Sequence, residues 1–205
     1  MPVLILFTLS SCDKSNDSGY QPAPEDDFMA LKVGNYWIYQ NYDIDSNGVA
    51  TPTNDWDSAY ISKDTVINGQ TYFKMIRKPV VFMSGQFPVY LRDSSGYLVD
   101  SDGQIHMSAT NFTDTLYTDT TTTPILYYGY LRMFAKDSLI TVPAGTFTTR
   151  TARFSVVPVN PNDPHPVRYT YDVYARNVGR IKYHSFFYSG DKHFEARLER
   201  YHLEP

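Results

Sequence analysis

The stretch DSLITVPAGTFTTRTARFSVV, from Asp137 to Val157, predicts two β-strands joined by a tight turn. Pro143 suits the second position of a type I turn, where φ lies near about −65°. Gly145 suits the left-handed position that closes such a turn into a bulge. The flanking Leu, Ile, Val, Thr and Phe residues favour a pleated sheet surface over a helix. Other segments on both sides repeat this hairpin design.

These segments together predict an all-β domain. Asn68-Gly69 is typical of a two-residue type I′ hairpin, because both positions need a positive φ. Turns of this kind divide the chain between Leu31 and Leu203 into roughly ten or eleven short strands. We expect a single antiparallel, strongly curved sheet that forms a barrel, a half-barrel or two packed sheets. Gly145 and Gly179 are the predicted bending points.

The composition limits the classes of function. The chain has 205 residues, 42% of them hydrophobic, which is enough for one well-buried core in one domain. Its formal net charge is −4 and its 18 basic residues are scattered, which argues against a nucleic-acid partner. Eighteen tyrosines raise the aromatic share to 16%, as expected of sheet-rich chains.

The single cysteine, Cys12, ends an apolar segment. The residues Leu9-Ser10-Ser11-Cys12 resemble the bacterial lipobox, in which the cysteine is acylated and becomes the mature N-terminus. We therefore predict a lipoprotein signal peptide over 1–11, an acylated Cys12 with a disordered tether over 12–27, and an antiparallel β domain over 28–205. No Lys or Arg precedes the apolar run, which departs from the usual signal. The alternative is a buried N-terminal strand, but the polar run from Asp13 continues a strand poorly.

Several short motifs follow this N-terminus in a characteristic order. The chain carries VGNYWIY at Val33–Tyr39, DTVINGQTY at Asp64–Tyr72, YLRD at Tyr90–Asp93, VPAGTF at Val142–Phe147 and YARNVG at Tyr174–Gly179. In this order they resemble an uncharacterised family of Bacteroidota envelope lipoproteins, sometimes labelled TapB-like. The resemblance implies a secreted, membrane-anchored β domain with an outer-membrane location, on the periplasmic side or at the surface. It carries over no catalytic residue.

The leading functional hypothesis is a non-enzymatic lipoprotein whose β domain binds a ligand or acts as a scaffold. Its partners would be the membrane, through palmitate-type acyl chains, and a lipid or glycan ligand; the oligomeric state stays open. The alternatives are a carrier of lipid or another apolar ligand in a β cavity, and a glycan-binding or glycan-cleaving envelope protein. The sequence contains no G-x-S-x-G, H-E-x-x-H, phosphate-binding loop or C-x-x-C motif. Enzyme activity is the less favoured class, and no cofactor is expected.

His193 and Glu195 share one face of a predicted strand, which is compatible with a metal ion. No third ligand is evident, so no metal site is predicted. The alternating charges of Glu195, Arg197 and Glu199 more simply indicate a solvated face. A four-residue loop at Ser189–Lys192 would give a hairpin with the following pairs: Lys182 with Glu199, His184 with Arg197, Phe186 with Glu195, Tyr183 with Leu198, Ser185 with Ala196, and Phe187 with Phe194.

Aromatic side chains are the candidate ligand contacts. They would stack on sugar rings if exposed, or line a cavity if they faced inward. This set comprises Tyr127, Tyr128, Tyr130, Tyr169, Tyr171, Tyr174, Tyr183 and Phe187. The favoured alternative is an interior filled at ordinary core density, in which Phe187→Ala would cost about 3–5 kcal/mol. Separately, Asp-Thr patterns in a Thr-rich loop resemble O-glycosylation acceptors of Bacteroidota, at Thr115 and Thr120.

Overall fold

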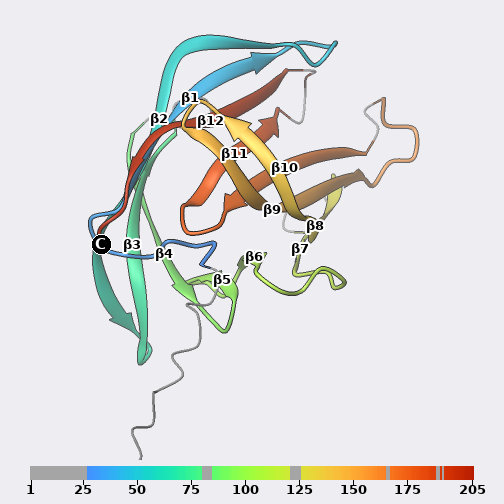
Figure 1. Ribbon diagram of the computed structural model, residues 1–205. Helices are drawn as coiled ribbons and strands as arrows, with labels where there is room; N and C mark the ends of the chain where they lie inside the picture. Colours follow the sequence, from blue (N-terminus) through green and yellow to red (C-terminus); the bar gives the residue numbers. More distant parts are fainter. Residues whose placement is uncertain (1–26, 80–84, 121–125, 165–166, 188–189, 191) are drawn as a thin grey trace, which may run out of the picture.

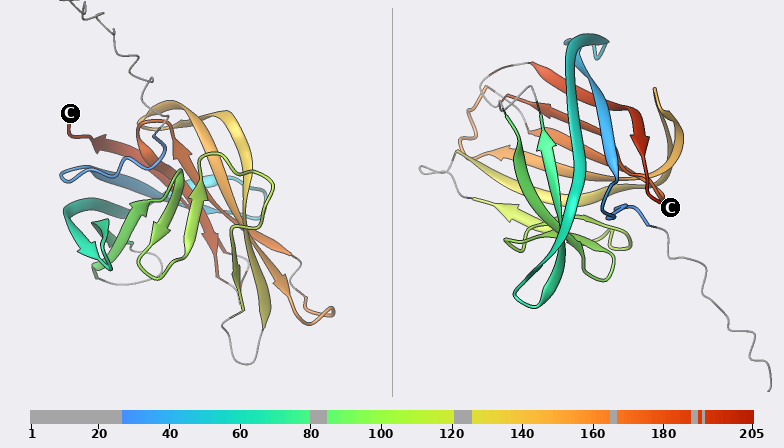
Figure 2. Two further views of the ribbon diagram at one scale, coloured as in Figure 1. Left: turned by 90° about the horizontal axis from the view of Figure 1, so that it is seen from below. Right: turned by 90° about the vertical axis from the view of Figure 1, so that its left-hand side faces the viewer.

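The computed structural model describes residues 27–79, 85–120, 126–164, 167–187, 190 and 192–205. Within these residues the chain is all-β, as predicted, and twelve strands form one antiparallel sheet that curls into a nearly closed barrel (Figure 1, Figure 2). The strands are β1 (Tyr36–Ile44), β2 (Ala50–Ile67), β3 (Gln70–Lys78), β4 (Phe87–Asp93), β5 (Tyr97–Asp100), β6 (Ile105–Ser108), β7 (Tyr117–Asp119), β8 (Tyr127–Val142), β9 (Gly145–Pro158), β10 (Arg168–Ala175), β11 (Gly179–Phe186) and β12 (His193–His202).

The strand order follows the chain almost everywhere. Neighbours in the sheet run β6-β5-β4-β3-β2-β1-β12-β11-β10-β9-β8-β7, so the pairing of β1 with β12 is the one link between distant segments. The free edges are β6 and β7, and β6 also contacts β8 and β9. The two edges therefore approach each other, which shields strand edges that would otherwise be open to pairing.

The predicted turns occur at both positions, although the ladder shows no bulge at Gly145. Val142 pairs with Gly145 across Pro143-Ala144, and Gly145 has a φ of 141°. Asn68 and Gly69 have φ values of 50° and 76°, as a type I′ turn requires. These turns were readable from sequence because each depends on the local φ preferences of two or three residues.

The irregularities of the ladder lie elsewhere than at the predicted bending points, because Gly145 and Gly179 are the first residues of β9 and β11, directly after turns. The long β8–β9 hairpin instead shifts register on both sides of Ala135, close to Asp137, which has a φ of 52°. A second shift, between β10 and β11, leaves Ile181 without a ladder partner. Such bulges bend a strand and redirect its side chains.

The predicted β11–β12 register is also wrong, by two residues. Lys182 pairs with Arg197, His184 with Glu195, Phe186 with His193, Tyr183 with Ala196, and Ser185 with Phe194. The ladder ends at Phe186 and His193, so the connection is longer than the predicted loop. A shift of two residues keeps every side chain on its predicted face, and the hydrophobic pattern cannot distinguish the two registers. The rings of Phe187 and Phe194 still meet, at 5.1 Å between centroids.

The segment before β1 closes one end of the barrel. Phe28, Met29 and Ala30 are all buried, and they join the two apolar clusters that fill this end. The carboxylate of Asp27 accepts hydrogen bonds from the backbone N–H groups of Met29 (2.7 Å) and Ala30 (2.9 Å), which fixes the conformation of the segment. The chain thus enters the domain at its closed end.

Two of the sequence motifs meet at this closed end. The indole N–H of Trp37 donates to the carbonyl of Val178 at 2.7 Å. Gly179 has a φ of 89°, and a Cβ there would lie 3.3 Å from the Met29 carbonyl oxygen and 3.4 Å from the Trp37 ring. A glycine is therefore needed both for the backbone conformation and for the close packing.

Candidate ligand-binding cavity

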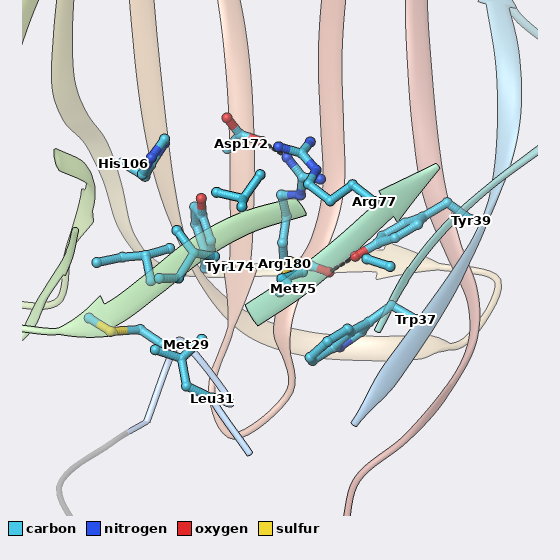
Figure 3. A pocket seen from close by; sticks show the side chains of 14 residues that line it. Met29, Leu31, Trp37, Tyr39, Met75, Arg77, His106, Asp172, Tyr174 and Arg180 are labelled. Atoms are coloured by element: carbon cyan, nitrogen blue, oxygen red, sulfur yellow. Dashed lines mark hydrogen bonds and ion pairs between the residues drawn. The ribbon is translucent and has the colours of Figure 1, made fainter. Parts of the chain in front are cut away.

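The barrel interior contains a cavity of about 200 Å³ (Figure 3). The favoured alternative of a filled interior concerned Phe187, which does not line this cavity and is 41% exposed. Side chains from β1, β2, β3, β4, β5, β6, β10 and β11 and from the segment before β1 line the cavity: Met29, Leu31, Trp37, Tyr39, Ala59, Met75, Arg77, Val89, Leu91, Leu98, His106, Asp172, Tyr174 and Arg180.

The lining divides into an apolar and a polar side. Figure 3 shows Met29, Leu31 and Trp37 on one side of the cavity, and His106, Asp172 and Arg77 on the other. The apolar side belongs to the closed end of the barrel, where the entering segment packs against β1. The cavity can therefore hold a molecule that has an apolar part and a polar part.

Arg180 and Asp172 form an ion pair on the polar side, at 2.9 Å between Nη1 and Oδ1. The bulge at Ile181 places Arg180 opposite Tyr174, on the inner face. Burial by itself lowers the pKa of Arg180, but the negative charge of Asp172 more than offsets this, and the pKa lies above its ordinary value. The hydroxyl of Tyr39 donates to the Arg180 carbonyl at 2.8 Å, and the guanidinium lies 4.2 Å from the ring centre of Tyr183.

Arg77 of β3 lines the same cavity but differs from Arg180. Its guanidinium makes no hydrogen bond or ion pair with any residue that the structure describes, and it lies beside a second positive charge. The charge of Arg180 lowers the pKa of Arg77, and burial lowers it further. Asp172 acts in the opposite direction but forms its ion pair with Arg180. Arg77 is thus a cation with unused hydrogen-bond donors at the wall of a cavity.

Three tyrosines surround this polar side and stay protonated. Burial is the main cause that raises the pKa values of Tyr39, Tyr174 and Tyr183. The hydroxyl of Tyr183 donates to the buried carboxylate of Asp57, which also accepts from Asn41 Nδ2 at 2.8 Å. Because they keep their protons, these hydroxyls serve as hydrogen-bond donors rather than as bases or nucleophiles.

A second hollow, of about 250 Å³, adjoins the cavity and shares His106 and Asp172 with it. It is lined mainly by residues of β7 to β10, including Tyr117, Leu131 and Phe154. The Nε2 atom of His106 lies 2.9 Å from Asp100 Oδ2, which holds the imidazole at this junction. The polar side of the cavity therefore lies toward the region where β6 approaches β8 and β9, away from the closed end.

The structure separates the predicted aromatic set. Tyr174 lines the cavity, and Tyr183 lies behind Arg180. Tyr127 is partly buried beside Asp119, at 3.5 Å from hydroxyl to carboxylate. The others lie outside the cavity lining; four of them are exposed and Tyr171 is partly buried: Tyr128, Tyr130, Tyr169, Tyr171 and Phe187. Strand alternation explains the separation, because Tyr169 and Tyr171 share one face of β10 and Tyr174 lies on the other.

The sequence analysis missed Arg77, Asp172, Arg180 and Tyr39. Arg77 lies two residues after Met75 on β3, so the two share a face, and both line the cavity. The available signal was that Arg77 stands on the face of β3 that otherwise carries apolar residues such as Met75. Its meaning depends on the partners that meet it from other strands, and the sequence does not supply these.

The outer face differs from the prediction at Glu195. This carboxylate is only 8% exposed and forms ion pairs with Lys182 and Arg197, so it does not belong to a solvated face.

His193 Nδ1 lies 3.1 Å from His184 Nε2. Among the described parts of the chain, no group of three or more His, Cys, Asp or Glu residues is arranged to hold a metal. Cys12 and the tether to residue 26 lie outside the described residues.

The predicted glycosylation acceptors lie near β7. Thr120 is exposed, whereas Thr115 is partly buried and its hydroxyl accepts a hydrogen bond from Arg132 Nε at 2.9 Å. Modification of either threonine stays a prediction.

The fold and the cavity define a class: a twelve-stranded antiparallel β barrel, nearly closed, with a charged and apolar interior site. Two solved structures are similar to this chain. One is described as "a putative lipoprotein from Parabacteroides distasonis ATCC 8503"; it is 13% identical, with a TM-score of 0.54, and the match covers 86% of this chain and 99% of that one. The other is described as "a putative exported protein with YmcC-like fold" from Bacteroides fragilis NCTC 9343, with 13% identity, the same coverage and a TM-score of 0.49.

The likeness to the first structure shows the fold. No family model matches the chain, and no curated protein matches it. The part of the chain that the structure describes has no helix long and apolar enough to cross a membrane.

Proposed function

We propose that this protein is a lipoprotein of the cell envelope, anchored in the outer membrane through acyl chains on Cys12, and that its β barrel binds a small molecule in the interior cavity. The cavity of about 200 Å³ beside Arg77 and Arg180 is the observation that carries the binding role. A scaffold role does not explain an unfilled interior lined by a guanidinium that pairs with none of the described residues, since unfilled space in a core reduces stability.

The lining supports binding rather than catalysis. Asp172 is the one carboxylate among the residues that line the cavity, and it is held by Arg180. Glycoside cleavage usually needs two carboxylates, and ester cleavage needs an activated nucleophile. The lining contains no serine or cysteine, and its tyrosines keep their protons.

Glycan binding by the outer aromatic residues is less well supported. Phe134 and Tyr169 lie on the outer side of β8 and β10, but the guanidinium of Arg153 lies over both rings, 4.2 and 4.8 Å from their centres. Sugar rings stack on open aromatic faces, and here Arg153 already occupies one face of each ring.

The anchor follows from the sequence, and its test is biochemical. Stable anchoring needs two or more acyl chains, which a lipobox cysteine receives. Cys12→Ser should abolish the incorporation of labelled fatty acid and move the protein out of the membrane fraction. Unchanged membrane association together with unchanged labelling would contradict the anchor.

The binding role is tested by filling the cavity. Ala59 lines the cavity and is buried, so Ala59→Leu would occupy part of the space; Ala50→Leu, at the start of β2 and outside the lining, is the matched control. Native mass spectrometry of protein purified from its own envelope should detect a bound small molecule in the wild type and the control, and much less in Ala59→Leu. Equal occupancy in all three proteins would place the ligand elsewhere and refute the interior site.

A further inference from the structure

We infer that the ligand is a small organic acid, and that Arg77 binds its carboxylate while the apolar tail packs toward the closed end of the barrel. This inference rests on the proposed interior binding site and names the chemistry of its ligand. Four observations carry it: the charges of the lining, the missing partner of Arg77, the polarity of the two sides and the cavity volume.

The charges of the lining leave one positive charge in excess. Arg77 and Arg180 contribute two guanidinium groups, and Asp172 contributes one carboxylate. Asp172 is 2.9 Å from Arg180, whereas Arg77 has no ion pair with a described residue. His106 also lines the cavity, but it is paired with Asp100, which lies outside the lining. A bound anion would balance the excess charge.

Arg77 also has hydrogen-bond donors that no described residue accepts. A guanidinium has five N–H donors in a planar arrangement that matches a carboxylate in a two-point contact. Arg77 is partly buried, so its donors stay available to a ligand that enters the cavity, and the neighbouring Arg180 adds repulsion that an anion would reduce. An acid bound at Arg77 would satisfy these donors and reduce the repulsion. Tyr174, which lines the same cavity and stays protonated, would offer one more donor.

The size and the opposite wall define the rest of the ligand. An apolar protein cavity of about 150 Å³ holds benzene, so about 200 Å³ suits a molecule of roughly ten non-hydrogen atoms. The side of the cavity opposite Arg77 is formed by Met29, Leu31 and Trp37 (Figure 3). A carboxylate with a tail of six to eight carbons fits both requirements.

The experiment compares octanoate with its uncharged analogue octanol. Titration calorimetry would use the chain from residue 12 onward with Cys12→Ser, which removes the acyl chains that would otherwise require detergent. We expect octanoate to bind at least about tenfold more tightly than octanol, because charge-assisted hydrogen bonds are the strong ones. In Arg77→Met this preference should disappear while octanol affinity stays the same. Arg77→Lys should keep part of the preference, and Arg200→Met, at an exposed arginine of β12, should keep all of it.

Thermal unfolding of the same proteins separates a binding role from a structural one. Arg77→Met should unfold at the same temperature as the parent or higher, because it removes a partly buried cation that lies beside Arg180 and has no ion pair with a described residue. Equal affinity for octanoate and octanol, both lost in Ala59→Leu, would overturn the acid assignment and leave the interior site standing. Absence of binding for both compounds would overturn the inference and count against the site itself. Destabilisation by Arg77→Met with an unchanged preference would likewise refute the assignment.

Discussion

Phe28 offers the sharpest test of how the closed end of the barrel is built. This residue precedes the first strand, yet its side chain is 1% exposed and packs in the cluster of Met107 and Leu131. The guanidinium of Arg150 lies 4.2 Å from its ring centre. Phe28→Ala removes the buried ring and leaves a void, which for buried phenylalanines costs about 3–5 kcal/mol. We expect about 4 kcal/mol here, because the loss of the ring also removes the contact with Arg150.

Phe134→Ala is a matched control, because Phe134 also has a guanidinium 4.2 Å above its ring but is 56% exposed. Its cost should stay below about 1 kcal/mol. Urea unfolding followed by tryptophan fluorescence would give both values, and thermal unfolding should show a fall of about 8–16 °C for Phe28→Ala. A cost below about 1.5 kcal/mol, or one equal to that of Phe134→Ala, would refute the view that the entering segment is part of the core.

Two further predictions concern the rest of the barrel. Trp37→Phe removes the indole donor to the buried Val178 carbonyl and should cost about 1–3 kcal/mol in urea unfolding. The control Trp56→Phe, at a residue that is 45% exposed, should cost under about 0.5 kcal/mol. Similar costs for the two variants would contradict a role for the hydrogen bond. Burial, and then the charge of His193, lower the pKa of His184. The unfolded chain therefore binds this proton more readily, so the free energy of unfolding should fall as the pH drops through about 6.5, and His184→Gln should flatten that slope. An identical slope in the variant would show that His184 does not contribute.

Much of the fold was predictable because it is local. Turns at Asn68-Gly69 and Pro143–Gly145 depend on the φ preferences of adjacent residues, and strand class follows from β-branched and aromatic residues between turns. The antiparallel order also follows, since short turns force consecutive strands to be neighbours. The single pairing that completes the sheet, β1 with β12, has no local signal.

The sequence by itself determined an all-β antiparallel domain, its turns and the faces of its strands, because these depend on residues that are close together in the chain. Only the tertiary structure decided the register of β11 with β12, the bulge at Ile181 and the closure of one end by Phe28. It also decided the cavity, where Arg77 meets Arg180 and Asp172 from strands about a hundred residues away. The alternation of side chains along a strand shows which residues share a face, but it does not show which faces pack together or where a cavity remains between them.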